Sequence, residues 1–121
     1  MYDQLSSIAA SLGQIRSSAL LNTSAVVGTS AVEFTIVDSP SSVSGDLIKI
    51  KIVNRSATAD IAWKITRDDT VPAINTTTGS VDIGSIILPK QMEYFVVEAN
   101  ARLFIVASAA GVDVAVTSYL V

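Results

Sequence analysis

The sequence contains neither histidine nor cysteine. Without cysteine there is no disulfide and no thiolate metal ligand, so nothing indicates a disulfide-stapled secreted scaffold. Without histidine, a serine nucleophile would need a lysine or a carboxylate as its base. The chain has no Ser-x-x-Lys and no Gly-x-Ser-x-Gly pattern. These absences predict a protein that is not an enzyme.

Charged residues are also few, at 16% of the chain against ~25% in an average soluble domain. The net charge is −3 and there is no basic stripe, so nucleic acid is not expected as a partner. A small domain has a high surface-to-volume ratio and should need more charge than average. The excess apolar surface is most easily placed between subunits, because obligate interfaces resemble a domain core cut in half. A very well packed monomer is the alternative.

Other kinds of site have little support. No apolar run approaches the ~20 residues that a membrane span needs, and the first 16 residues lack the basic and apolar regions of a signal peptide. The carboxylates of Asp60, Asp68 and Asp69 could hold a hard cation such as Ca²⁺, but adjacent aspartates in a loop are more often turn formers. With only six glycines, no phosphate-binding glycine-rich loop is present. We expect no metal and no cofactor.

The N-terminal residues have the spacing of a short amphipathic helix. Asp3 can act as its N-cap, and apolar side chains then recur at intervals of three and four residues, as in the seam of a coiled coil. This N-terminal seam consists of Leu5, Ile8, Leu12 and Ile15, with Ala19 one further step along. A helix of under five turns is marginal alone in water. It could dock on its own sheet, bundle with other copies, or order only on assembly.

The rest of the chain alternates with the period of β-strands. The strongest signal is at residues 48–52, where three isoleucines alternate with two lysines. Other strand-like segments cover residues 31–37, 61–66, 85–88, 93–98, 102–108 and 112–121, and residues 22–30 form either a connector or an edge strand. Residues 67–84 are the longest polar stretch, with one short strand expected. No helix separates the strands, which excludes a βαβ layout.

We therefore predict a mainly β protein. Its fold is expected to be a single antiparallel β-sandwich or jelly-roll-like module of about seven or eight strands, preceded by the short helix. The predicted division places an N-terminal arm at residues 1–24 and the sandwich at residues 25–121.

Residues 48–121 resemble a group of small structural proteins of tailed bacteriophages. The carrying segments are IVNRSATADIAWKI, SIILPKQMEYFVV and ARLFIVASAAGVDVAVTSYLV, with the best match at residues 103–116. In that group a V-N-x-S step leads to a short strand with an aromatic, and an L-x-P-G-like turn precedes the next strand. Lys90 and Gln91 depart from this pattern, since glycine is usual there.

The resemblance implies a virion protein without catalytic residues, most simply a capsid decoration or cement protein. Its implied partners are further copies of itself, as a homotrimer, and the major capsid protein or other virion proteins. Leu5, Ile8, Leu12 and Ile15 are the residues expected to anchor the module or to make the trimer contact. The alternative is a tail or fibre module that binds a host receptor or glycan through residues 67–84, which an exposed Trp63 beside that loop would favour.

Overall fold

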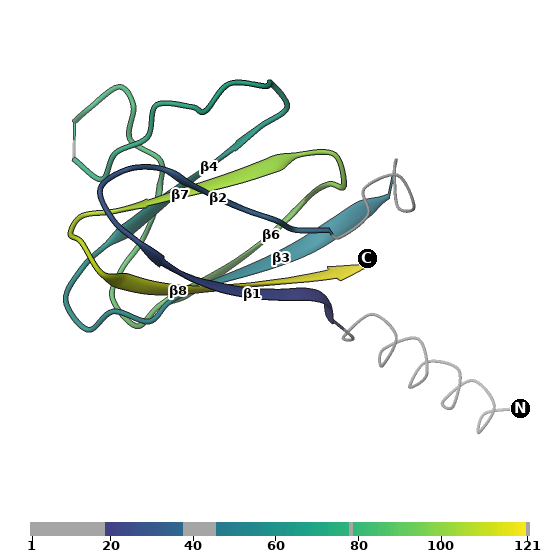
Figure 1. The fold of residues 1–121 in the computed structure, drawn as a ribbon, viewed down its shortest axis with the longest axis horizontal. Coiled ribbons are helices and arrows are strands. Elements are labelled where there is room, and N and C mark those ends of the chain that lie inside the picture. The colour runs from purple at the N-terminus through teal and green to yellow at the C-terminus, as the bar shows by residue number, and fades with distance from the viewer. Residues whose placement is uncertain (1–18, 38–45, 78, 121) are drawn as a thin grey trace, which may run out of the picture.

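In the part of the chain that the structure describes, eight strands form two four-stranded antiparallel sheets that pack face to face (Figure 1). The structure is a computed structural model that describes residues 19–37, 46–77 and 79–120. The predicted antiparallel sandwich of seven or eight strands is confirmed, whereas the predicted N-terminal helix lies outside the described residues. The strands are β1 (Ala19–Val27), β2 (Val32–Phe34), β3 (Leu47–Asn54), β4 (Ile61–Thr66), β5 (Ser85–Ile87), β6 (Met92–Glu98), β7 (Arg102–Ala107) and β8 (Val112–Leu120).

The order of the strands is that of a jelly roll. Sheet A has the order β1-β8-β3-β6, and sheet B has the order β2-β7-β4-β5. Apart from β4 and β5, strands that follow one another in sequence lie in opposite sheets, so most connections cross the sandwich. Sheet A therefore has β1 and β6 at its edges, and sheet B has β2 and β5 there.

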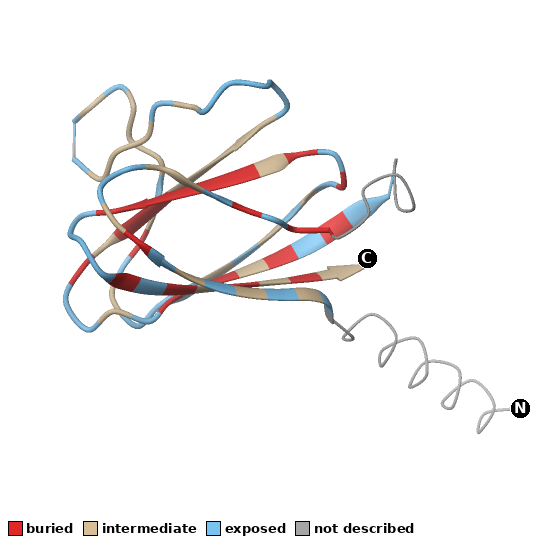
Figure 2. Ribbon diagram, in the orientation of Figure 1, coloured by how far each residue is buried: buried red, intermediate tan, exposed pale blue. Residues whose placement is uncertain are grey.

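The core lies between the two sheets and follows the alternation in the sequence. Ile48, Ile50 and Ile52 are fully buried, and the lysines between them point to the outside. Figure 2 shows this alternation as bands along β3. The strand β7 differs, because Leu103 to Ala107 are all buried. It packs on the core with one face and lies under the β4–β5 loop with the other.

The β4–β5 loop, residues 67–84, covers the outer face of sheet B. Lys64 donates a hydrogen bond to the carbonyl of Ala73 at 2.7 Å, and Arg102 donates one to the carbonyl of Asp68 at 2.8 Å. The expected short strand in this loop is wrong: its described residues form only one isolated bridge, between Asn75 and Ile83. Side-chain oxygens accept from three backbone N–H groups of this loop, those of Asp68, Thr77 and Asp82.

The start of the β-domain also differs from the prediction. β1 begins at Ala19, so residues 19–24 belong to sheet A and not to the arm. Ala19, the residue that continues the spacing of the N-terminal seam, is paired with Tyr119. The sequence of β1 carries small and polar residues with no alternation strong enough to show where the strand begins.

The turn before β6 shows how the chain accommodates Lys90 where glycine is usual in the resembling proteins. Gln91 donates its backbone N–H to the carbonyl of Leu88 at 3.1 Å, and Pro89 occupies the second position of this turn. Lys90 occupies the third position with φ of 64°, as a type II turn requires. The chain therefore keeps the turn that glycine would favour, with a lysine in the left-handed region.

Candidate functional site

The strand β6 is an edge strand whose backbone groups divide into two sets. Among the described residues its one neighbour is β3. Just beyond the two ends of the ladder, Asn54 donates to Gln91 at 2.9 Å and Ala99 donates to Asp46 at 3.0 Å. In an antiparallel ladder only every second pair exchanges hydrogen bonds. The odd-numbered residues of β6 therefore bond to β3, and the even-numbered ones direct their N–H and C=O groups to the open edge.

The same even-numbered residues carry exposed apolar side chains. Met92 is 54% exposed, Tyr94 50% and Val96 53%, which places them among the most exposed large apolar residues of the described chain. We call these three residues the β6 strip. Beside it on β3, the Lys49 ammonium lies 4.8 Å from the centre of the Tyr94 ring, and Lys51 is paired with Tyr94 across the ladder. The strip is thus apolar with a basic border.

β6 has little of the usual protection of an edge strand, since its charged side chains are Glu93, which faces Trp63, and Glu98, at its end. Natural edges are often short, bulged, or broken by proline or lysine. The two edges of sheet B, β2 and β5, have three residues each, whereas β6 has seven in a regular register with β3 and contains neither proline nor lysine. Such an edge is able to accept another strand.

The inner face of β6 is only partly covered. Phe95 stacks on Trp63 of β4, with the ring centres 4.0 Å apart and the planes at 9°. The indole N–H of Trp63 donates to the carboxylate of Glu93 at 3.3 Å. Phe95 and Val97 remain partly exposed, whereas the inward side chains of β3 are fully buried. This stack covers one ring face of Trp63, which removes that face as a flat platform for a sugar.

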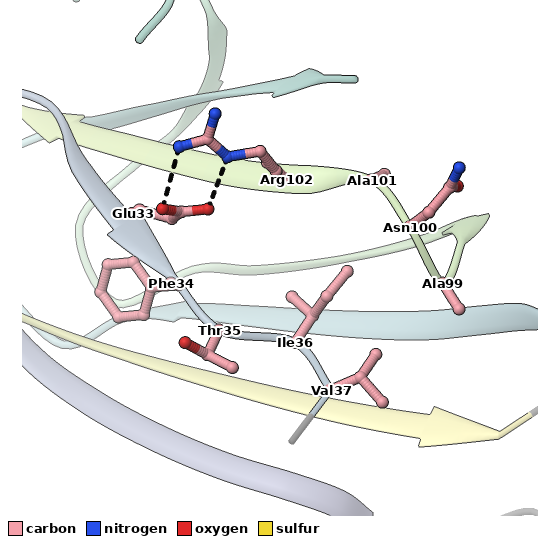
Figure 3. A pocket seen from close by; sticks show the side chains of 9 residues that line it. All are labelled: Glu33, Phe34, Thr35, Ile36, Val37, Ala99, Asn100, Ala101 and Arg102. Carbon is pink, nitrogen blue, oxygen red and sulfur yellow. Dashed lines mark hydrogen bonds and ion pairs between the residues drawn. The ribbon is translucent and has the colours of Figure 1, made fainter. Parts of the chain in front are cut away.

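A second feature is a hollow of about 210 Å³ between residues 33–37 and 99–102 (Figure 3). Its floor is apolar, with Phe34 and Ile36, and its rim carries a two-pronged ion pair between Glu33 and Arg102 at 2.8 and 3.1 Å. Ligand pockets usually measure roughly 300–1,000 Å³. The lining offers no nucleophile with a base beside it, so the hollow is small and without a reactive pair.

The ion pair at the rim has a defined protonation. The hydrogen bonds from Arg102 lower the pKa of the Glu33 carboxyl below its ordinary value of 4.5, partial burial opposes this shift, and the guanidinium charge adds to it. The same contacts raise the pKa of Arg102. Both groups are therefore charged at neutral pH, and the pair ties β2 to β7.

The residues singled out in the sequence are not gathered into one site. Leu5, Ile8, Leu12 and Ile15 lie outside the described residues. Asp60 precedes β4 and Asp68 and Asp69 follow it, so six strand residues, roughly 20 Å, separate them. In the described part of the chain, no three acidic residues come close enough together to hold a metal ion.

The β6 strip was present in the sequence without being recognised as a site. Tyr94 falls in phase with Met92 and Val96, but residues 94–97 are apolar on both faces, and periodicity does not say which face is outside. The fold decides this, because it places Phe95 and Val97 over the core. The described part of the chain holds no helix that is long and apolar enough to cross a membrane.

Comparison with known proteins adds little. No protein-family model and no curated protein matches the sequence. Among solved structures, a chain from the disulfide-linked pili of Bacillus endospore appendages is similar, with 11% identity and a TM-score of 0.44. The match covers 88% of this chain and 93% of that one. A likeness at this level carries no argument about function.

Proposed function

We propose that the chain is a non-enzymatic structural protein of a tailed-phage particle, and that it decorates the head as a cement protein. The observation that carries this proposal is the β6 strip, an apolar row on an open strand edge. Surface of this kind is costly on a free monomer and suits permanent contacts. The sequence resemblance over residues 48–121 to structural proteins of tailed bacteriophages suggests that these contacts are made in a phage particle.

The mechanism is burial of apolar surface across subunit boundaries. A protein that binds the assembled shell better than the open one shifts the equilibrium toward the assembled shell by mass action. The charge of the chain favours apolar contacts over electrostatic ones, since only 16% of its residues are charged. Its partner on the head would be the major capsid protein or a neighbouring virion protein.

The N-terminal seam supplies the second contact of this proposal. Leu5, Ile8, Leu12 and Ile15 repeat at the spacing of a coiled coil, and three such helices would bury their apolar stripes against one another. The chain would then act as a homotrimer, with the sandwiches arranged around a short bundle. A trimer suits the three-fold positions of a shell, where three capsid subunits offer it the same surface.

Immunogold electron microscopy of phage particles induced from the source organism would test the proposal. Antibodies against the purified chain should label the heads at regular positions. Label confined to tails or fibres would favour the receptor-binding alternative, which the covered face of Trp63 makes less attractive. Particles without label, in a preparation where the antibody detects the added pure protein, would reject the virion role.

A further inference from the structure

We propose that the β6 edge binds the β6 edge of a second copy, antiparallel and about a two-fold axis, so that two copies of sheet A join into one eight-stranded sheet. This inference concerns how the chain binds itself, and it does not depend on a virion location. It follows from the open backbone groups, the half-covered inner face and the charges around the edge.

The open backbone groups fix how the two edges can meet. Met92, Tyr94, Val96 and Glu98 are the residues of β6 that do not bond to β3, and of these Glu98 already accepts from the N–H of Ala101 at 3.0 Å through its C=O. Full overlap of two antiparallel copies places Tyr94 opposite Val96 of the second copy, and Met92 opposite its Glu98. The Tyr94–Val96 pairs can each exchange two N–H···O bonds, and the N–H of Glu98 can donate to the C=O of Met92. In this register every N–H and C=O group of Tyr94 and Val96 finds a partner, and the axis passes beside Phe95.

Pairing with a second copy would also cover the inner face of β6, which is only partly covered in the single chain. Phe95 of the two copies would lie directly opposite each other, in a pair without hydrogen bonds, where side chains approach most closely. Each Phe95 already stacks on Trp63 with one face and remains partly exposed. The second copy would cover the exposed part of the ring and extend the aromatic stack across the axis.

The charges around the edge are complementary under the same two-fold axis. Each copy presents Lys49 and Lys51 on β3 beside the β6 strip, and Glu98 at the far end of β6 on the same outer face. The axis brings Glu98 of the second copy beside Met92, toward the end of the strip where Lys51 lies. To reach the second copy, Glu98 would give up its ion pair with Arg67. This pair contributes little stability, because both side chains are more than half exposed. A second copy therefore matches both the apolar row and its basic border.

The other long edge of the described chain fits less well. β1 is also an edge of sheet A, with nine residues. Its outward side chains include Asn22 and Ser24 between Leu20 and Val26, so its apolar row is interrupted. β6 alone combines a continuous apolar row, open backbone groups and an uncovered inner face within the described strands.

Residue-resolved amide hydrogen exchange of the full chain by NMR would test the pairing. The odd-numbered amides of β6 bond to β3 and should be protected at every concentration, which provides an internal control. The amides of Tyr94 and Val96 should exchange at least about tenfold more slowly in concentrated than in dilute protein. Fast exchange at Tyr94 and Val96 throughout, with Phe95 and Val97 protected, would overturn the proposal.

The variant Val96→Pro separates edge pairing from folding. Proline at an open edge position removes a donor that the sandwich does not use, but it blocks an added strand. Light scattering should show a lower mass than for the wild type, and the Tyr94 amide should exchange fast at every concentration. Val96→Thr keeps both the N–H and the β-branched shape and should behave as the wild type.

A partner other than a second copy would give a different result. If β6 serves a strand from another protein, the mass of the wild type and of Val96→Pro would be equal, and the exchange at Tyr94 would not depend on concentration. That outcome rejects pairing between copies. If Val96→Pro does not fold, the exchange pattern of the wild-type chain still decides between the two results.

Discussion

At the scale of single residues, Asn54 shows how one polar side chain organises a connection. It is fully buried at the end of β3, and its amide group donates to the carbonyls of Ala59 at 2.8 Å and Ile87 at 3.0 Å. Its side-chain oxygen accepts from the backbone N–H of Ser56 at 3.0 Å. Asn54 thereby joins β3, the β3–β4 loop and β5. The V-N-x-S step of the sequence resemblance has this structural role.

Replacing Asn54 with alanine should destabilise the fold strongly. The change leaves two buried carbonyls and one N–H without partners, and each such group costs about 1–3 kcal/mol. We expect the free energy of unfolding in urea to fall by at least about 3 kcal/mol. Asn22→Ala, at an exposed position on β1, should change it by less than about 0.5 kcal/mol. Equal small effects would show that water replaces the bonds of Asn54.

Glu33 should make stability depend on pH below neutrality. Its pKa is lowered in the folded state by the hydrogen bonds from Arg102, with partial burial acting against them. The ion pair therefore contributes fully above the unfolded pKa, near 4.5, and its contribution is lost as pH falls through the lower folded value.

The test compares thermal unfolding of the wild type and of Glu33→Gln across this range. The wild type should have the higher melting temperature at neutral pH, and the two should converge as the pH drops well below 4.5. A difference in melting temperature that stays constant over the whole range would mean that the carboxylate charge does not contribute.

The positions of some of these single residues could be predicted from the sequence. Ile48, Ile50 and Ile52 were expected inside and are fully buried. The turn at Lys90 was in doubt because glycine is usual there, and the structure keeps the positive φ. The ion pair of Glu33 with Arg102 joins residues 69 positions apart, and no local pattern brings such residues together.

At the scale of elements, the alternation of apolar and polar residues predicts where strands occur. It predicts less well where each strand begins and ends, and which of its faces is exposed. β3 was clear because one face is isoleucine and the other is lysine. The residues of β1 are small and weakly patterned, so the sequence of residues 22–30 allows a connector as well as an edge strand. The exposure of the β6 strip followed only from the order of strands, which leaves β6 at the edge of sheet A. Strand order depends on contacts that are distant in sequence, so local patterns do not reveal it.

The approach of the β4–β5 loop to β4 depends on Gly84. A Cβ atom at this position would lie 2.7 Å from the carbonyl oxygen of Trp63 and 2.9 Å from a methyl carbon of Ile74. Gly84→Ala should therefore lower the free energy of unfolding by about 1–3 kcal/mol, because the backbone of β4 has to shift. The matched control is Gly28→Ala, where the nearest atom is 3.9 Å away, and it should cost little. Chemical denaturation of both variants measures the difference, and equal costs would indicate that the loop moves freely.

At the scale of the whole molecule, the two outer faces of the sandwich are treated differently. The β4–β5 loop covers the outer face of sheet B, and Phe104 and Val106 are buried beneath it. Sheet A has no such cover among the described residues, and it has the long edges. The described chain thus covers the outer face of sheet B with its own loop and leaves apolar side chains exposed on sheet A. The low charge of the sequence predicts apolar contacts between subunits, and the β6 strip is the surface that we propose for them.

The last prediction concerns the N-terminal seam, and it needs the edge contact removed first. In the Val96→Pro background, self-association through β6 is blocked, so any remaining oligomer depends on another contact. If Leu12 packs between the helices of three copies, Leu12→Asp places a charge in their shared apolar seam and should abolish the trimer. Light scattering should then give the mass of a single chain, while circular dichroism retains the β signal of the sandwich. Leu12→Met, which keeps the apolar volume, should remain trimeric. A mass that does not change with Leu12→Asp would mean that the seam does not join copies. If the Val96→Pro chain is then already a monomer, β6 is the contact through which this chain binds itself, whereas a persisting oligomer would point to a contact other than β6 and the seam.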